Sequence, residues 1–155
     1  MMCRYPFDTK KYKIIEAQPQ GEYAHSNYPE SRFAVDFILP LKTPVLAVKE
    51  GIIIAAKHDS EKHYNPIQLN MSTDEMREVG IKSLNIVGID HGNGAITEYA
   101  HLSTKKVVSV GQKINEGQII GYTGRSGLMD ADHLHFNAFT KENDVVRSIP
   151  VEFME

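Results

Sequence analysis

Short apolar runs that end in glycine or proline turns limit the folds that this chain can adopt more than any other feature of its sequence. Residues 33–38, 52–56 and 84–89 are such runs, and their length is typical of strands. Gly111-Gln112 and Gly117-Gln118, six residues apart, mark two more short strands with glycine turns. Short strands at this spacing, with almost no helical periodicity, predict a mainly β fold. We expect an antiparallel β-sandwich or a barrel-sandwich hybrid with a groove.

One short helix is expected inside a polar insertion. Polar residues dominate from 58 to 71, where the strand pattern fails. Ser72 can cap a helix, and Glu75 follows three residues later, as in a capping box. The pattern predicts a helix over residues 72–80 that Gly80 ends.

The length of 155 residues fits one domain whose core needs no disulfide or metal to hold it together. We expect a single domain over residues 1–155, with an N-terminal arm at 1–20 and a core over about 21–149. The arm is polar except for an apolar patch at residues 12–15. That patch predicts one short strand laid against the main body.

The charge pattern and the single cysteine exclude several classes of protein. The net charge is −3 and no Lys/Arg cluster is larger than a pair, which argues against a nucleic-acid partner. Cys3 is the only cysteine, so the chain forms no internal disulfide and no cysteine-based zinc site. No stretch is long and apolar enough to span a membrane, and the start lacks the apolar core of a signal peptide. From the residues alone, the protein either stays in the cytoplasm or has had an export segment removed.

The segment His133-Leu134-His135-Phe136 is the most informative candidate site. In a strand, side chains alternate between faces, so both imidazoles would share one face, with bases roughly 6.6 Å apart. Leu134 and Phe136 would then face the core. This spacing lets one imidazole bind a metal while the other reaches a substrate held beside it. A lone His-x-His pair is a weak motif, so its meaning depends on the rest of the chain.

Three other residues are candidates to join the pair. Asp36 lies among apolar neighbours, where a carboxylate is costly to bury unless it binds a metal or a partner. It is equally compatible with a carboxylate that accepts hydrogen bonds from backbone amides. His25 lies in a loop and His101 ends a strand, and each alone is most simply a histidine without a special role. Two histidines and one aspartate would satisfy a zinc site with an open position.

Several motifs together resemble the M23 zinc metallopeptidases, the lysostaphin-like and LytM-like enzymes that cut peptide bonds in bacterial peptidoglycan. The matching segments follow in family order from about residue 25 to residue 139. They are Phe33-Ala34-Val35-Asp36-Phe37, Pro40-x-x-Thr43-Pro44-Val45-x-Ala47, Gly51-Ile52-Ile53, Asp90-His91-Gly92-Asn93-Gly94, Tyr99-Ala100-His101-Leu102-Ser103, Gly111-Gln112, Gly117-Gln118-x-Ile120-Gly121, Gly124-x-Ser126-Gly127 and His133-Leu134-His135-Phe136.

The resemblance implies a role for each candidate residue. His25, Asp36 and His135 match the ligands of one zinc ion per chain, while His101 and His133 match the two catalytic histidines beside the metal. It also implies antiparallel sheets around a narrow groove with zinc at its floor, and an extracytoplasmic location. One departure concerns His25: ten residues separate it from Asp36, where the family commonly places these two ligands three residues apart.

The sequence therefore predicts a zinc metalloendopeptidase that hydrolyses peptidoglycan peptide bonds through a metal-activated water, acting as a monomer. No glutamate is placed like the base of a His-Glu-x-x-His enzyme, so histidine would carry the proton. One alternative is an inactive domain of the same fold that binds cell wall or activates another hydrolase. The twin Gly-Gln units also resemble biotinyl or lipoyl carriers, but the chain lacks the Met-Lys turn of such carriers. A phosphocarrier of related fold is the other alternative, and it would not need Asp36 or the His-x-His pair.

Overall fold

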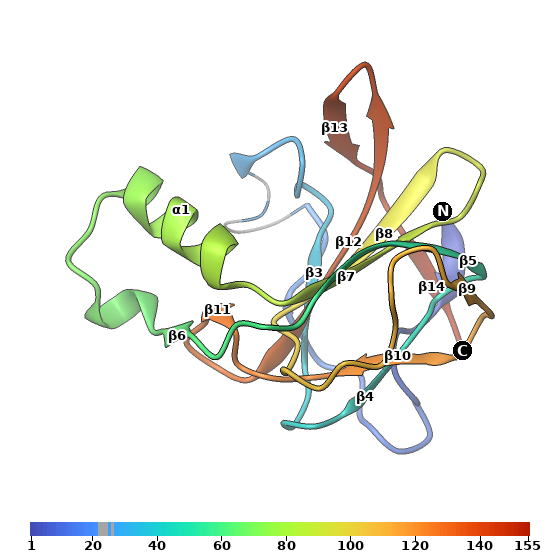
Figure 1. The fold of residues 1–155 in the computed structure, drawn as a ribbon, viewed down its shortest axis with the longest axis horizontal. Helices are drawn as coiled ribbons and strands as arrows, with labels where there is room; N and C mark the ends of the chain where they lie inside the picture. The colour runs from blue at the N-terminus through green and yellow to red at the C-terminus, as the bar shows by residue number, and fades with distance from the viewer. Residues whose placement is uncertain (22–24, 26) are drawn as a thin grey trace.

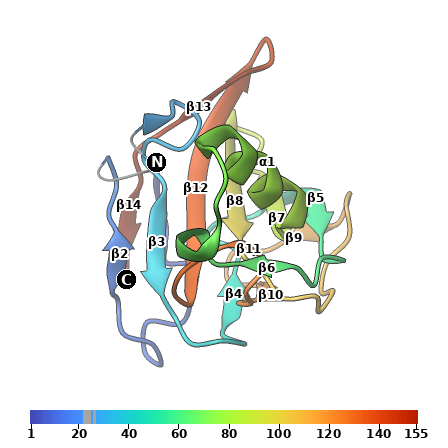
Figure 2. The ribbon, with the colours of Figure 1, turned by 90° about the vertical axis from the view of Figure 1, so that its left-hand side faces the viewer.

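One large sheet of eight strands forms the body of the protein, and every pairing within it is antiparallel. The computed structural model describes residues 1–21, 25 and 27–155. The strand order is β2-β3-β12-β8-β7-β5-β9, with β13 paired to β12, and Figure 2 shows the central strands side by side. The predicted mainly β fold is confirmed.

Most of the strands are short, as the apolar runs predict, and β12, with ten residues, is the longest of those described. Those of the large sheet are β2 (Glu16–Gln18), β3 (Val35–Ile38), β5 (Gly51–Lys57), β7 (Ile86–Asp90), β8 (Ala95–Ala100), β9 (Lys113–Ile114), β12 (His133–Glu142) and β13 (Val145–Ser148). Three pairs lie outside it: β1 (Met2–Arg4) with β14 (Glu152–Met154), β4 (Pro44–Leu46) with β10 (Ile119–Tyr122), and β6 (His63–Tyr64) with β11 (Gly127–Leu128).

The core lies on one face of β12. Leu134 and Phe136 are fully buried there, while His133 and His135 keep some exposure on the other face. The ring of Phe136 meets that of Tyr99 edge-on, with centroids 5.4 Å apart. The β4–β10 ribbon, which Figure 1 shows at the foot of the sheet, adds buried residues to the same apolar cluster. The period-two prediction for this strand is confirmed.

The N-terminal segment takes a larger part in the core than its polar composition predicts. The short strand expected at residues 12–15 lies at Glu16–Gln18 instead, where it pairs with β3. A second strand, β1, pairs in parallel with β14 at the other end of the chain. Phe7, just after β1, is fully buried. Partners so distant in sequence leave no local pattern, which is why the sequence did not predict them.

The helix α1 (Thr73–Ser83) confirms the predicted start but not the predicted end. The Ser72 hydroxyl accepts a hydrogen bond from the Glu75 amide at 3.2 Å, which caps the first turn. The helix continues past Gly80, so the prediction that this glycine ends it was wrong. A Cβ at Gly80 would meet the Leu128 side chain at 3.0 Å, so the glycine lets the helix approach β11 closely.

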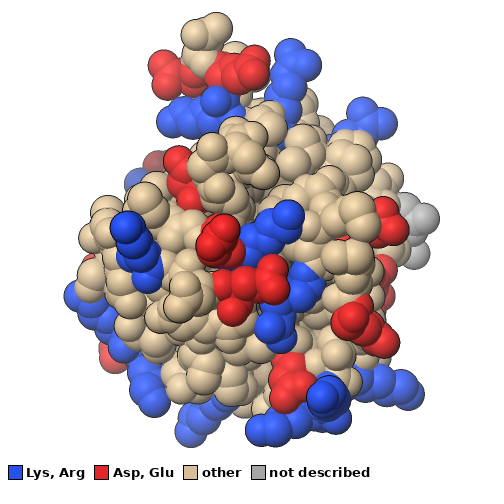
Figure 3. Space-filling view, turned by 90° about the vertical axis from the view of Figure 1, so that its right-hand side faces the viewer, with Lys and Arg blue, Asp and Glu red and all other residues tan. Residues whose placement is uncertain are grey.

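The helix stands beside the sheet at the left of Figure 1, after a short 3-10 helix, η2 (Pro66–Gln68). Within the described residues, no helix is long and apolar enough to cross a membrane. Figure 3 shows the side of the molecule away from α1, where acidic and basic side chains intermingle.

Candidate metal centre

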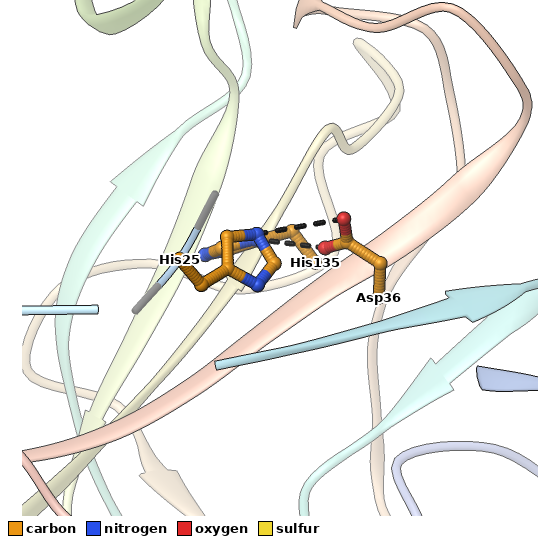
Figure 4. A group of neighbouring side chains, drawn as sticks. All are labelled: His25, Asp36 and His135. Atoms are coloured by element: carbon orange, nitrogen blue, oxygen red, sulfur yellow. Dashed lines mark hydrogen bonds and ion pairs between the residues drawn. The ribbon is translucent and has the colours of Figure 1, made fainter. Parts of the chain in front are cut away.

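Asp36 and His135 face each other because β3 and β12 pair in register at these two residues. The His135 Nδ1 atom lies 3.0 Å from the Asp36 Oδ1 atom, within hydrogen-bonding distance. His25 joins them from its loop, with its Nε2 atom 3.5 Å from the other carboxylate oxygen, Oδ2 (Figure 4). One ligand atom from each of the three residues lies within 4.8 Å of the others. The structure thus brings together the three residues that the sequence predicts as metal ligands.

The ten residues between His25 and Asp36 do not keep the two side chains apart. The His25 Nδ1 atom donates to the backbone carbonyl of Ala34 at 3.2 Å. That hydrogen bond places the proton on Nδ1, so the Nε2 atom that faces Asp36 keeps its lone pair. An imidazole held in this tautomer by a backbone carbonyl is a common arrangement for a metal ligand.

His101 and His133 form a second group next to the first. Their ring centroids are 4.6 Å apart, and the His133 Nε2 atom lies 3.7 Å from Asp36 Oδ2. Each ring donates its Nδ1 proton to a backbone carbonyl: His101 to Ser126 at 2.7 Å, and His133 to Ala131 at 2.8 Å. Both Nε2 atoms therefore keep a lone pair. The structure brings together all five residues that the sequence predicts for the site.

The charges of the site follow from burial and from close neighbours. Burial alone would raise the pKa of the Asp36 carboxyl, but the hydrogen bond from His135 and the nearby histidines outweigh it and lower that pKa to about 2. Burial lowers the pKa of His101 to about 3, and the neighbouring His133 and His135 add to this effect. Burial also lowers the pKa of His25. Near neutral pH, Asp36 is ionised while His25 and His101 are neutral, which are the protonation states that metal binding and proton acceptance require.

His135 differs from the other histidines of the site. Burial acts to lower its pKa, but the hydrogen bond and the negative charge of Asp36 outweigh burial, and the pKa is raised. Deprotonated imidazole is the form that binds a metal, so a metal ion must compete with a proton for His135. Metal affinity should therefore fall in acid.

The donor set fits zinc. Two imidazole nitrogens and one carboxylate oxygen are the three protein ligands of many catalytic zinc sites. All three side chains are mostly buried, with 13%, 6% and 18% exposure for His25, Asp36 and His135. The described residues offer a metal no other group of three or more such ligands.

A buried polar network holds the Ser126 carbonyl that orients His101. The Ser126 hydroxyl accepts from the Asn85 amide at 2.9 Å and donates to the Leu102 carbonyl at 2.9 Å. The Asn85 side-chain amide donates to the carbonyls of Ser60 at 2.8 Å and Leu102 at 3.3 Å. His101 itself has a left-handed backbone, with φ 64°, a conformation that most side chains rarely adopt.

Asn85 and Ser126 support the His101 ring through hydrogen bonds that the sequence did not predict. Asn85 is fully buried at the start of an apolar strand, and an asparagine there is the signal that could have drawn attention to it. Ser126 lies in the segment Gly124-x-Ser126-Gly127, which belongs to the family resemblance without a predicted role for the serine.

His91 and His63 lie outside the site. The His91 Nδ1 atom donates to the Glu50 carbonyl at 2.7 Å, and its Nε2 atom is hydrogen-bonded to the Thr97 hydroxyl at 2.8 Å. These contacts fit the predicted role of His91 in stabilising its turn. His63 donates from Nδ1 to the Arg125 carbonyl at 2.9 Å.

Comparison with known proteins gives a consistent result. The model of Peptidase family M23 matches residues 30–147. The peptidoglycan DD-endopeptidase ShyA of Vibrio cholerae is 28% identical over 152 residues, which make up 98% of this chain and 29% of that protein. Lysostaphin of Staphylococcus simulans is 31% identical over 120 residues, which make up 74% of this chain and 20% of that protein. The chain spans less than a third of the length of these curated relatives.

A solved structure, the catalytic domain of lysostaphin from Staphylococcus simulans, is 25% identical and superposes with a TM-score of 0.57 over 90% of each chain. A zinc containing peptidase from Vibrio cholerae is also 25% identical, with a TM-score of 0.58 over 94% of this chain and 37% of that one. Four of the five predicted site residues lie inside the family match. His25 lies before its first residue, so its assignment depends on the geometry described above.

Proposed function

The chain belongs to peptidase family M23, and on that premise we propose that it is a zinc metalloendopeptidase that hydrolyses peptide bonds of bacterial peptidoglycan. The observation that carries the proposal is the convergence of five predicted residues on one point, three as ligands and two beside them. Relatives named as peptidoglycan endopeptidases support the substrate class. A cell-wall substrate would place the reaction outside the cytoplasmic membrane, and we propose that a monomer carries it out.

His25, Asp36 and His135 would hold one zinc ion. His25 would bind through Nε2 and His135 through Nδ1, because those are the atoms that face the Asp36 carboxylate. When bound, zinc acts as a Lewis acid on a peptide carbonyl and lowers the pKa of a water to about 7.

His101 and His133 would handle the protons of the reaction. Each has its Nδ1 proton fixed on a backbone carbonyl, so Nε2 is the atom that accepts a proton from the attacking water. Once protonated, the same nitrogen donates to the leaving amine or stabilises the oxyanion. The buried, neutral His101 suits the accepting role, and the His133 Nε2 atom lies beside it, 3.7 Å from Asp36 Oδ2.

Incubation with purified peptidoglycan, followed by mass spectrometry of the released fragments, tests this function. We expect peptide fragments with new termini, no release after chelation, and recovered release when zinc is added back. Zinc bound at one ion per chain without any release of fragments would favour the alternative, an inactive domain that binds cell wall.

A further inference from the structure

An open hollow of about 500 Å³ lies beside the metal centre on the side of His135. His135 lines one part of it, and Glu98 of β8 lines another. Phe139 and Val146, from β12 and β13, supply apolar walls. His135, one of the predicted zinc ligands, therefore borders both the hollow and the proposed reaction centre.

Strand register places Glu98 on the same face of the sheet as His135. Glu98 pairs with Asn137 on β12, while His135 pairs with Ala100, two residues further along β8. Glu98 and His135 are therefore diagonal neighbours, a relation in which long side chains lie within reach of each other. On the other side of Glu98 the paired residue is Gly88, which has no side chain to cover the carboxylate.

The other polar groups around the hollow already have partners. Glu30 forms an ion pair with Arg77 of α1. The Asn137 side chain donates to the Glu30 carbonyl at 2.7 Å and accepts from the Ser148 hydroxyl at 2.8 Å. Asp144, at the rim, is 99% exposed and lies 4.0 Å from Lys141.

Glu98 is the exception. It is partly buried, and no hydrogen bond or ion pair joins its carboxylate to any other described residue. No lysine or arginine is among the described residues that line the hollow. A partly buried carboxylate without a partner costs free energy, and a cationic ligand would remove that cost.

We propose that Glu98 is the specificity-determining anion of a substrate subsite that binds a primary ammonium group of the peptide, with its methylene stem against Phe139 and Val146. This rests on the proposed function, since the ammonium would belong to a diamino acid of a peptidoglycan peptide. Long aliphatic amines commonly lay their stem on apolar surface while the charged end reaches a polar partner. A carboxylate–ammonium hydrogen bond is stronger than one between neutral groups.

Binding of two matched peptides tests the subsite without any need for turnover. The probes are an uncrosslinked, lysine-containing stem peptide and the same peptide with its side-chain amine acetylated, titrated calorimetrically into the zinc-loaded protein. We expect the wild type to bind the free amine about tenfold more tightly than the acetylated peptide. Glu98→Gln, which keeps the shape of the side chain and removes its charge, should bind both peptides alike.

Asp144→Asn is the matched control, because it removes one negative charge at the rim and should keep the preference. Equal binding of the two peptides by the wild type, or no binding of either, would overturn the subsite. A preference that survives in Glu98→Gln would also overturn it. A wild type that shows the preference but never cleaves peptidoglycan would contradict the proposed function and still support the subsite.

Discussion

The two groups of histidines in the site differ in how their ring nitrogens are placed around the Asp36 carboxylate. His25 and His135 each turn a ring nitrogen toward the Asp36 carboxylate, so that one charged group organises both. His101 and His133 are held mainly from behind, through Nδ1, by the carbonyls of Ser126 and Ala131. His25 is also held through Nδ1, by the Ala34 carbonyl, so what sets the first group apart is that its ligand atoms lie within 4.8 Å of one another around Asp36. Substitutions that affect one group and leave the other intact test that division.

Asp36→Ala should have the largest effect, because it removes the carboxylate around which the ligand group is arranged. We expect zinc content to fall below about a tenth of the wild-type value, and peptidoglycan cleavage to be lost with it. Elemental analysis of the purified variant measures the first, and fragment release measures the second. A variant that keeps one zinc per chain would show that the carboxylate is not a ligand.

His101→Asn should separate the second group from the first. Asparagine tolerates the left-handed backbone at this position better than most residues, so the fold should be kept. We expect full zinc content and a fall in kcat/KM of about 10² to 10⁴, the usual contribution of a general acid or base. Loss of zinc in this variant would place His101 among the ligands and would contradict the separation of metal ligands from proton carriers.

Asn85→Ala should disturb the orientation of His101 indirectly. It removes hydrogen bonds that hold the segment around Ser126, whose carbonyl accepts from the His101 ring. The side chain makes several buried hydrogen bonds, so we expect a loss of about 1–3 kcal/mol in the free energy of unfolding. We also expect roughly a tenfold lower kcat at full zinc content, read from fragment release under saturating substrate.

Thr43→Ala is the control for Asn85→Ala. Thr43 is also buried, and its hydroxyl donates to the Pro40 carbonyl at 2.6 Å; among the described residues it makes no hydrogen bond with a histidine of the site. It should lose comparable stability and keep its kcat. An equal fall of kcat in both variants would mean that Asn85 acts through stability alone.

His91 belongs to neither group, and its variant should have the smallest effect. Burial lowers the pKa of His91 below the value of about 6.5 expected in the unfolded chain. The unfolded state therefore binds more protons as the pH falls through 6.5, and the folded state is destabilised there. As the pH falls from 7 to 5, the free energy of unfolding should decrease less steeply in His91→Gln than in the wild type. Chemical denaturation of both zinc-free proteins at several pH values measures the two slopes, and identical slopes would contradict the assignment.

The strand that carries His133 and His135 was predictable because period-two alternation acts over neighbouring residues. It placed both imidazoles on one face and Leu134 in the core, as the structure shows. The likeness to a known family then divided their roles. Nothing in local sequence required the imidazole of His25 to reach Asp36 across ten residues, because that contact depends on how the loop folds back over the sheet.

Three other features could not be predicted from local sequence patterns, because each depends on residues far apart in the chain. The β1–β14 pair joins the two ends of the chain, so no window of sequence contains both strands. Gly80 is a residue type typical of helix ends, but here it allows the helix to pack closely against Leu128, a residue 48 positions away. The orientation of His101 depends on a left-handed backbone and on a carbonyl 25 residues further along the chain.

The division of the site into ligands and proton carriers is tested most directly by anomalous diffraction from zinc-loaded crystals at the zinc absorption edge. We predict one peak within about 2.0–2.2 Å of His25 Nε2, an Asp36 oxygen and His135 Nδ1, the usual zinc–ligand distances. The Nε2 atoms of His101 and His133 should lie outside bonding distance of that peak. A peak that leaves out His25, or one bonded to His101 or His133, would contradict the account.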